Sequence, residues 1–469
     1  MDTIDFIKEI ETTYDVGSIK VNGIQIWPFL RSKYLSLMEN RNLNINIKNK
    51  NLTNPIKLIK NLSYGLSNLY GKKEYLVFTD SMELRLKDGL YINKLLNDLY
   101  DFLGKDNTLV IENPYYHAHY NICSLYMKKI ISLDLFNILC SIYPFNFSSE
   151  IENEEILKEI NLKYGVNLEY KRIINKFFSY CWVFDKIHRL VKPKIIFISE
   201  YYSLPHQAAI YSARKLGIKT VEFQHGIINS KHAAYNVFID LNKLHFPEYL
   251  LVFGDYTKNI FNIDNFFIDG KHVFPIGNMY LTYINNSYTP SEETVEIFNN
   301  FRTKYLKIVA ISSQIGIEDK LIDFLIKSAL ISKSILYILI PRNFDKGYLH
   351  TSFPPNLIII ENLDVYKIIK EADFHATVNS TCAIEAPALG VPNILININN
   401  LSKKYYSKIL TNAKVTKFVD TPEEFVKLIQ TWKPNSKDEI KQLHEGFYAK
   451  NHKESLKKAL DKIMNDTNP

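Results

Sequence analysis

Cysteine and glycine are scarce in this chain of 469 residues. No two of the four cysteines have the CxxC spacing of a zinc-ligand pair, and no disulfide framework is indicated, so a reducing compartment fits best. The chain has only 16 glycines, and neither the GxGxxG pattern nor a P-loop occurs. The GxSxG and HExxH patterns are also missing. Dehydrogenase, P-loop nucleotidase and common hydrolase classes therefore lack their signatures.

The chain also lacks long apolar runs and a large net charge. No uncharged apolar run reaches about 18 residues, the length that spans a bilayer, and residues 1–17 are acidic without an apolar signal core. We therefore expect a soluble cytoplasmic protein, or one bound to the inner face of the membrane. The net charge of +7 permits an anionic substrate or membrane surface and does not call for nucleic acid.

A metal site is not expected. His117 and His119 are two residues apart, but no carboxylate or cysteine has a spacing that would complete a ligand set. A loop that faces an acceptor molecule is the favoured interpretation for His117. The chain also has no DxD pair to hold a divalent ion against a diphosphate. We expect a metal-independent mechanism with no cofactor.

Strands alternate with helices through most of the chain. In the first half, apolar strands end near residues 80, 114, 200, 223, 252 and 275, and in the second half near residues 312, 340, 360, 378, 398 and 420. This alternation predicts an α/β fold with two doubly wound, Rossmann-like domains that face a cleft. The predicted parts are an N-terminal domain at 1–285 with a helical N-terminal extension, a C-terminal domain at 293–435, and a helical tail at 436–469.

The basic segment 41–73 lies in the helical extension. It contains seven lysines and arginines and no acidic residue, and part of it has the spacing of an amphipathic helix. Such a helix can lie on an anionic membrane. A solvated basic face is the alternative, and the sequence leaves both open.

The stretch 379–392, NSTCAIEAPALGVP, predicts a ligand-binding corner between two strands. Ser380 and Thr381 stand where a helix begins, and backbone N–H groups there favour a phosphate. Glu385 comes about one turn later, where its carboxylate can accept bonds from ribose hydroxyls. Pro387 falls beyond the first turn, so the helix is expected to be short or kinked.

This stretch resembles the donor-binding segment of GT-B glycosyltransferases and the EAPxLGxP segment of the non-hydrolysing UDP-N-acetylglucosamine 2-epimerases. The resemblance implies that Ser380 and Thr381 contact the diphosphate and that Glu385 holds the ribose. Three further positions are expected near the donor nucleotide. Ser312 and Ser313 end one strand, Arg342 ends the next and can neutralise a diphosphate, and Asn362 follows a third strand.

A second corner is predicted at the carboxyl ends of two consecutive strands near residues 200 and 223. Polar residues follow both strands, and a right-handed crossover makes the strands parallel. The expected acceptor-side residues are Glu200, Tyr201, Gln224, His232 and Tyr235. His225 precedes a glycine at a strand end and is suited to acid–base work.

The QHG sequence at 224–226 resembles the corner of bacterial surface-polysaccharide transferases and of teichoic-acid polyol-phosphate transferases, where a histidine serves as the base. In capsule and sialic-acid transferases a His-Pro pair often contacts the donor phosphate. Here Ile340 precedes Pro341, which argues against a CMP-sugar donor.

These resemblances imply a GT-B glycosyltransferase of capsule, O-antigen or lipooligosaccharide assembly. A nucleotide-sugar would be the donor, and a glycan or lipid-linked oligosaccharide would be the acceptor. The alternatives are a CDP-polyol phosphotransferase and a catalytically silent GT-B subunit that binds a partner. A 2-epimerase is disfavoured, because this chain is about 90 residues longer than that compact fold needs.

Overall fold

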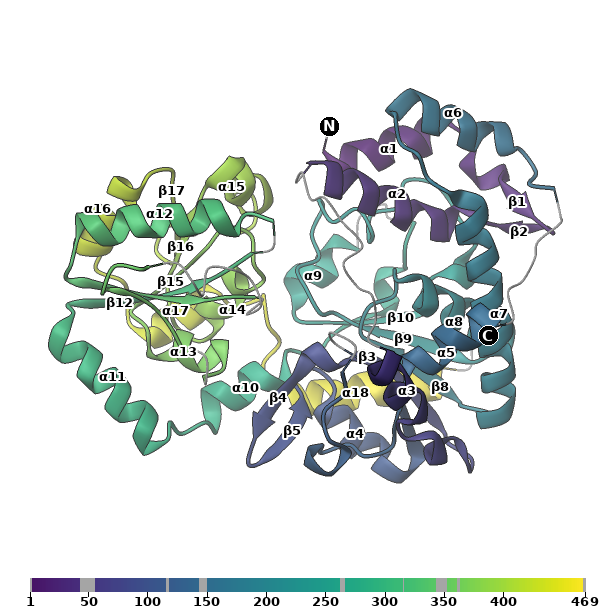
Figure 1. Ribbon diagram of the computed structural model, residues 1–469, viewed down its shortest axis with the longest axis horizontal. Coiled ribbons are helices and arrows are strands. Elements are labelled where there is room, and N and C mark those ends of the chain that lie inside the picture. Colours follow the sequence, from purple (N-terminus) through teal and green to yellow (C-terminus); the bar gives the residue numbers. More distant parts are fainter. Residues whose placement is uncertain are drawn as a thin grey trace. The chain divides into compact units, whose positions relative to one another are not determined.

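The computed structural model describes residues 2–42, 55–114, 118–142, 150–261, 266–314, 316–342, 352–360 and 363–466. The chain forms two compact units. Unit 1 consists of Met1–Met279 together with Ala449–Pro469, and unit 2 consists of Tyr280–Tyr448. Figure 1 shows the elements of each unit.

Unit 1 begins with a small helical layer. Helix α1 (Thr3–Thr13) buries Phe6, Ile7 and Ile10, whose spacing puts them on one helical face. A two-stranded hairpin, β1 (Lys20–Val21) with β2 (Ile24–Gln25), leads into α2 (Trp27–Asn42). Trp27 and Phe29 of α2 have no exposed surface and belong to the core.

The main body of unit 1 is a seven-stranded parallel sheet with the order β11-β10-β9-β8-β3-β6-β7. Its central strands are apolar runs that are buried along their length, as expected for a sheet covered on both faces. The strands are β3 (Tyr75–Asp80), β6 (Thr108–Asn113), β7 (Ile130–Ser132), β8 (Ile195–Ile198), β9 (Lys219–Phe223), β10 (Tyr249–Val252) and β11 (Val273–Pro275).

Helices and one hairpin surround this sheet. The long α7 packs along α8, and Phe29 of α2 stacks on Phe177 of α7 with ring centroids 3.8 Å apart. The strand β7 and the hairpin β4–β5 (Leu84–Lys87 and Leu90–Asn93) were not expected from the sequence. The helices are α3 (Pro55–Ser63), α4 (Asn97–Leu103), α5 (Leu133–Ile142), α6 (Glu154–Tyr164), α7 (Tyr170–Val191), α8 (Leu204–Lys215), α9 (Asp255–Ile260) and α18 (His452–Asn465).

Unit 2 is a six-stranded parallel sheet with the order β14-β13-β12-β15-β16-β17. In Figure 1, α12 and α16 lie along one face of this sheet, and α13 and α17 lie along the other. The strands are β12 (Lys307–Ser312), β13 (Ile335–Ile340), β14 (Leu357–Ile359), β15 (Phe374–Thr377), β16 (Asn393–Ile396) and β17 (Thr416–Val419). The helices are α10 (Met279–Asn286), α11 (Glu292–Lys304), α12 (Glu318–Ile331), α13 (Val365–Glu371), α14 (Cys382–Ala388), α15 (Leu401–Tyr406), α16 (Pro422–Thr431) and α17 (Lys437–Leu443).

The division between the units differs from the predicted boundaries. Nearly all of α10 belongs to unit 2, because the Asn285 amide donates to the Ala388 carbonyl and Lys370 donates to the Ile284 carbonyl. The predicted tail at 436–469 is also divided. Helix α17 belongs to unit 2, and α18 belongs to unit 1, where Lys219 donates to the carbonyl of Ile463 at 2.6 Å. Within the described residues, no helix is both long and apolar enough to cross a bilayer.

Candidate functional site

Each sheet has one point where the strand order reverses. In unit 1 the chain runs outward from β3 to β6 and β7, and then returns to β8 on the other side of β3. In unit 2 it runs from β12 to β13 and β14, and then returns to β15 on the other side of β12. Open α/β sheets bind ligands at the carboxyl ends of the strands at such a reversal. The two reversal points therefore define the candidate site residues in each unit.

At the unit 1 reversal, β3 ends in Asp80 and β8 is followed by Glu200. The Asp80 carboxylate accepts bonds from the Asn113 amide at 2.7 Å and from the Met82 N–H at 2.9 Å. Burial raises the pKa of Asp80. His206 of α8 donates from Nδ1 to the Glu200 carbonyl at 2.6 Å, and its buried Nε2 has no hydrogen-bond partner.

His225 lies next to this reversal, directly after β9. Its Nε2 is 3.0 Å from the Tyr202 hydroxyl, and its Nδ1 is buried without a hydrogen-bond partner. Burial raises the pKa of Tyr202 well above its ordinary value, so this hydroxyl keeps its proton at neutral pH. One edge of the imidazole is therefore held by Tyr202, and the other nitrogen is unused within the described structure.

Behind His225 lies a layer of buried groups that are neutral at pH 7. Glu222 of β9 accepts bonds from the Tyr235 hydroxyl at 2.6 Å and the Tyr201 N–H at 3.1 Å. Burial raises the pKa of Glu222 to about 8. Burial, with a smaller contribution from His225, lowers the pKa of His232 to about 4. A charge that forms on His225 would meet an uncharged layer behind it.

Three residues expected on the acceptor side are structural. Tyr201 and Tyr235 have almost no exposed surface, and their hydroxyls donate to the Ala234 carbonyl and to Glu222. Gln224 is buried as well, because its amide nitrogen donates to the Gly226 carbonyl at 2.8 Å and its oxygen accepts from the Phe253 N–H at 2.7 Å. These side chains shape the corner and do not face solvent, which corrects their expected placement. His117 lies outside the described residues.

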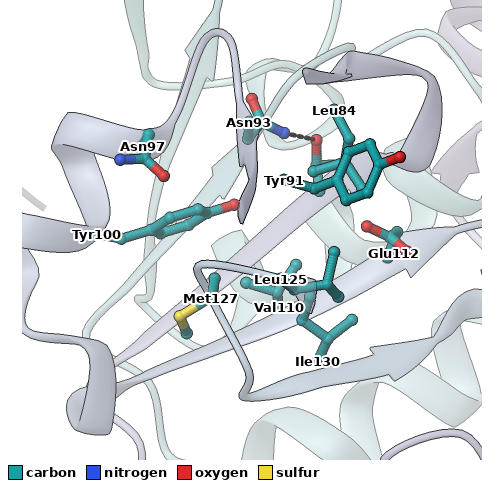
Figure 2. A pocket seen from close by; sticks show the side chains of 11 residues that line it. Leu84, Tyr91, Asn93, Asn97, Tyr100, Val110, Glu112, Leu125, Met127 and Ile130 are labelled. Atoms are coloured by element: carbon teal, nitrogen blue, oxygen red, sulfur yellow. Dashed lines mark hydrogen bonds between the residues drawn. The ribbon is translucent and has the colours of Figure 1, made fainter. Parts of the chain in front are cut away.

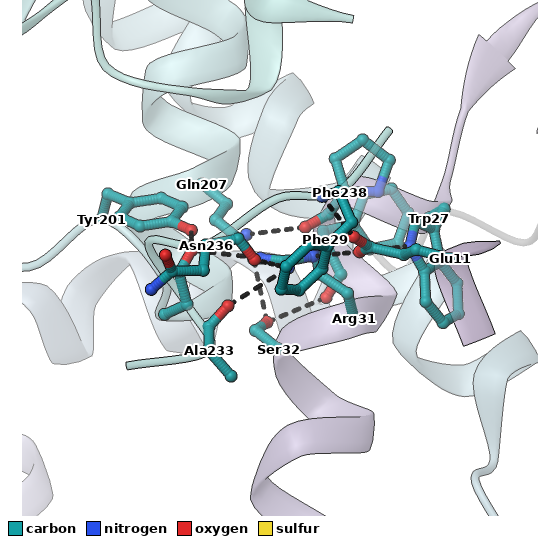
Figure 3. Close-up of polar contacts among 12 residues, drawn as sticks. Glu11, Trp27, Phe29, Arg31, Ser32, Tyr201, Gln207, Ala233, Asn236 and Phe238 are labelled. Atoms are coloured by element: carbon teal, nitrogen blue, oxygen red, sulfur yellow. Dashed lines mark hydrogen bonds and ion pairs between the residues drawn. The ribbon is translucent and has the colours of Figure 1, made fainter. Parts of the chain in front are cut away.

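The N-terminal helices hold the loop that follows His225 (Figure 3). Arg31 of α2 is buried and pairs with Glu11 of α1 at 2.8 Å. The opposite edge of its guanidinium donates to loop carbonyls, at 3.1 Å to Ala234 and 2.9 Å to Asn236. The carboxylate of Glu11 also accepts from the Phe238 N–H at 2.9 Å. The helical extension is therefore part of the framework of this corner.

At the unit 2 reversal, β12 ends in Ser312 and β15 ends in Thr377. The Ser312 hydroxyl lies 2.9 Å from Nε2 of His375, whose Nδ1 lies 2.7 Å from the Asn393 side-chain oxygen. Because an amide oxygen only accepts, the His375 proton is on Nδ1, and Ser312 donates to Nε2. Burial lowers the pKa of His375 to about 4. The Ser312 hydroxyl thus donates its proton to His375, and the expected contact of Ser312 with the donor nucleotide stays a prediction.

The polar residues that follow these two strands are largely buried, with Ser313 6% and Ser380 8% exposed, and the Ser380 hydroxyl accepts a bond from the Cys382 N–H at 3.3 Å. Ser313 directly follows β12, and Ser380 and Thr381 precede α14. Thr381 makes no side-chain capping bond to α14. Among the described residues, the buried side-chain oxygens of Gln314 and Asn379 have no hydrogen-bond partner. The chain next to β12 and β15 therefore contains hydroxyl and amide groups.

Glu385 is oriented inward, where its carboxylate accepts a bond from the Tyr366 hydroxyl at 2.9 Å. Only 4% of Glu385 is exposed, so ribose binding by this residue stays a prediction. Helix α14 is short and contains Pro387, as expected. Arg342 follows β13 and is exposed, and Asn362 lies outside the described residues.

The sequence analysis did not select Tyr202, Asp80, His206 or His375 as site residues. Asp80 and Tyr202 stand in polar strand-end sequences, FTDS and SEYYS, which were the available signal. His206 and His375 lie inside a helix and a strand, and nothing in the local sequence marks them.

A small cavity in unit 1 is not part of the candidate site. A cavity of about 10 Å³, about one water molecule in size, lies between β3, β6, the β4–β5 hairpin and α4. Figure 2 shows that its lining is mostly apolar, with a polar pair in which the Asn93 amide donates to the Thr79 hydroxyl at 2.8 Å. No group of three or more metal-ligating side chains occurs in the part of the chain that the structure describes.

No family model and no curated protein matches the sequence. Solved structures match over most of the chain. The UDP-GlcNAc 2-epimerase of Neisseria meningitidis bound to UDP-GlcNAc is 11% identical with a TM-score of 0.50, and covers 84% of this chain and 100% of its own. The UDP-GlcNAc 2-epimerase of Methanocaldococcus jannaschii in complex with UDP-GlcNAc and UDP is 14% identical with a TM-score of 0.50, and covers 83% and 99%. An S. aureus MnaA–UDP structure is 11% identical with a TM-score of 0.51, and covers 84% and 97%.

These likenesses, together with the two parallel sheets, show the fold. The chain has the GT-B architecture of two Rossmann-like domains, as the sequence predicted.

Proposed function

We propose that this protein is a metal-independent glycosyltransferase that uses a nucleotide-sugar donor. The observation that carries the proposal is the position of the predicted residues at the two strand-order reversals. His225 and Glu200 lie at the unit 1 edge, and Ser313, Ser380 and Thr381 lie at the unit 2 edge. A fold with two ligand-binding edges suits a reaction between two substrates.

In the proposed reaction, unit 1 binds the acceptor and His225 is the general base. Its Nδ1 takes the proton of an acceptor hydroxyl while that oxygen attacks the anomeric carbon of the donor. The bond from the sugar to the nucleoside diphosphate breaks, and the diphosphate leaves. Tyr202 holds Nε2 throughout, so the imidazolium that forms keeps one hydrogen bond.

Unit 2 would bind the donor nucleotide. Hydroxyls of Ser313 and Thr381 would donate to the diphosphate oxygens and hold the donor in place. The guanidinium of Arg342 would neutralise the negative charge that the diphosphate gains as the bond breaks. Glu385, with Tyr366 beside it, is the proposed ribose contact. The resemblances of both corners support an acceptor that is a glycan or lipid-linked oligosaccharide of a bacterial surface polysaccharide.

The second candidate is isomerisation of a nucleotide-sugar. It is favoured by the solved 2-epimerases, which this chain matches along nearly their whole length. An epimerase needs no acceptor, so the two candidates differ in what they do to a donor supplied alone. A CDP-polyol phosphotransferase and a silent partner-binding subunit remain further alternatives.

The first experiment measures thermal shifts of the full chain with UDP, GDP, CMP and CDP. A bound ligand raises the melting temperature in proportion to the logarithm of its concentration above Kd. We expect a shift with UDP or GDP. A shift with CDP alone would favour the phosphotransferase, and no shift with any nucleotide would favour the silent subunit.

The second experiment separates transferase from epimerase. Nucleotide-sugars that carry the preferred nucleotide are incubated with the protein, with and without a mixture of glycan acceptors, and the sugar is followed by NMR. A transferase forms a new glycosidic bond only when an acceptor is present. Conversion to an isomer in the absence of acceptor would replace the proposal by the epimerase.

A further inference from the structure

The segment 55–73 of unit 1 is attached to the protein by an unusual set of polar contacts. The Asn61 amide of α3 donates to the buried Asp134 carboxylate of α5 at 2.7 Å. The 3₁₀ turn Leu66–Leu69 is attached next to β7, because the Asn68 amide donates to the Ile130 carbonyl at 3.1 Å. Hydrogen bonds of this kind, at least partly buried, fix a segment in one position.

Tyr64 and Gly65 complete this attachment. Tyr64 stacks on His119 with ring centroids 4.1 Å apart and donates to the Tyr120 carbonyl at 2.9 Å. Gly65 has a φ of +67°, and a Cβ at this position would lie 1.8 Å from the Ile130 carbonyl oxygen. Only glycine fits such a left-handed position against another backbone. These contacts fix the side of the segment that faces the rest of unit 1.

The exposed side chains of the same segment include three large apolar ones. Ile59 of α3 is 66% exposed, Leu66 is 40% exposed, and Tyr70 at the end of the turn is 83% exposed. Scattered apolar residues on a surface need no explanation, but here three large ones lie within residues 59–70. Leu69 packs against the hydrophobic core together with the polar inner contacts, while Ile59, Leu66 and Tyr70 of the same segment stay exposed.

The charge around these residues has one sign within the segment. Lys60 and Lys72 are exposed, and residues 55–73 contain no acidic side chain. The neighbouring chain before β7 adds Lys128, which is exposed, and Lys129. Asp106 is an exposed acidic residue whose carboxylate lies 4.0 Å from the Lys129 ammonium group. The positive charges therefore exceed the negative ones around the apolar side chains.

From these observations we propose that the outer face of segment 55–73, defined by Ile59, Leu66, Tyr70, Lys60 and Lys72, binds the surface of an anionic lipid bilayer. Apolar side chains enter the boundary between headgroups and acyl chains, and lysines pair with the lipid phosphates. The mixed apolar and basic chemistry favours a bilayer over a protein partner, because a protein surface would have to supply both an apolar pocket and several carboxylates. This proposal does not depend on the proposed enzymatic function.

The test is sedimentation of the full chain with vesicles. One set contains phosphatidylcholine with one third phosphatidylglycerol, and the other contains phosphatidylcholine alone. We expect the protein to sediment with the anionic vesicles, and less as salt is raised, because screening weakens the lysine contribution. Failure to sediment with anionic vesicles at low salt would overturn the proposal.

Two variants test which residues bind. The triple substitution Ile59→Ser, Leu66→Ser and Tyr70→Ser removes the apolar groups and should lower the partition coefficient about tenfold or more. The pair Lys60→Gln and Lys72→Gln should lower it about fivefold for each lysine that contacts the lipid. Both variants keep the polar inner contacts, so their circular dichroism spectra and melting temperatures should match those of the original protein.

The matched control is the pair Leu162→Ser and Leu190→Ser on α6 and α7. These leucines are 85% and 65% exposed in the same unit, so the control removes comparable apolar surface elsewhere. It should leave vesicle binding unchanged. If the control and the triple variant lose binding equally, the interaction is a general property of the surface, and the assignment to segment 55–73 is wrong.

Discussion

The edges of the two sheets differ in the kind of polar group that they present. In unit 1 the residues at the reversal are titratable, with Asp80, Glu200, His206 and His225 close to one another and neutral Glu222 behind them. In unit 2 the residues next to the strand ends are hydroxyls and amides. Groups that can change protonation suit proton transfer, and fixed dipoles suit a ligand that is already charged. The difference agrees with chemistry in unit 1 and donor binding in unit 2.

The edges also differ in how they are supported. In unit 2 the polar residues pass directly into α14, so the helix satisfies the backbone that follows them. In unit 1, β9 is followed by a long loop that has no helix or strand until Lys243. The carbonyls of this loop need other partners, and Arg31 supplies donors for three of them. Unit 1 therefore depends on a distant segment of the chain where unit 2 depends on local structure.

The largest expected effect comes from His225→Ala. This change should lower kcat about 10²- to 10⁴-fold, because it removes the proposed base. It should leave the Kd of the donor nucleotide unchanged, since that ligand is assigned to unit 2. The measurement is steady-state turnover of the donor, together with thermal shifts by the nucleotide. The control is His272→Ala, and turnover that survives the loss of His225 would remove its assignment as the base.

The next effect is on stability. Arg31→Ala leaves the Glu11 carboxylate buried without its cation and removes the Arg31 donors from the carbonyls of Ala233 and Asn236, which should cost about 3–5 kcal/mol of unfolding free energy. Urea denaturation followed by circular dichroism measures it. The control Arg189→Ala breaks the exposed pair with Asp185 and should cost about 1 kcal/mol or less. A small loss for Arg31→Ala would mean that the loop holds its shape without the N-terminal helices.

The sequence predicted the fold well because the sheets are made of local signals. Each central strand is an apolar run that ends in polar residues, and both GT-B units follow from the alternation of strands and helices. The short strand β7 (Ile130–Ser132) and the hairpin at 84–93 were not predicted. β7 is only three residues long, and β4 (Leu84–Lys87) and β5 (Leu90–Asn93) have only partly buried, irregular patterns.

The candidate site was predicted only in part, and the reason is again physical. A strand end can be located from the sequence, so His225, Ser313 and Ser380 lie where they were expected. Whether a side chain faces solvent depends on distant partners. Ser312 is occupied by His375 from another strand, and Tyr201 is buried by the loop that Arg31 holds. No local pattern contains that information.

Glu222 gives a test of the buried layer in unit 1. Its folded pKa of about 8 is far above the ordinary value of 4.5, so the folded protein keeps a proton that the unfolded chain has lost. Stability should therefore fall as the pH rises from about 5 to 8. Glu222→Gln removes this pH-dependent loss of stability, because the amide does not titrate. The unfolding free energy of the variant relative to the original protein should therefore rise by roughly 1 kcal/mol for each pH unit in that range. Urea denaturation at pH 5, 6, 7 and 8 measures this difference.

The control for Glu222 is Glu439→Gln, which changes an exposed carboxylate in unit 2. Exposed groups have little effect on the pH dependence of folding at these pH values, so this variant should follow the original curve. If the difference between Glu222→Gln and the original protein is flat across pH 5 to 8, Glu222 is ionised in the folded state. The layer behind His225 would then carry a negative charge, which would stabilise an imidazolium and raise the basicity of His225.

The smallest expected effects are those on donor binding in unit 2. Ser313→Ala and Thr381→Val each remove one hydroxyl that we assign to the diphosphate, and a hydrogen bond to a charged group is worth about 1.5–3 kcal/mol. Each change should weaken nucleotide binding by about tenfold or somewhat more, as measured by isothermal titration calorimetry. The exposed Ser407→Ala is the matched control. With saturating donor, these variants should keep most of kcat, the opposite of His225→Ala. If Ser313→Ala lowered kcat and left the nucleotide Kd unchanged, donor binding and chemistry would not be divided between the two edges as proposed.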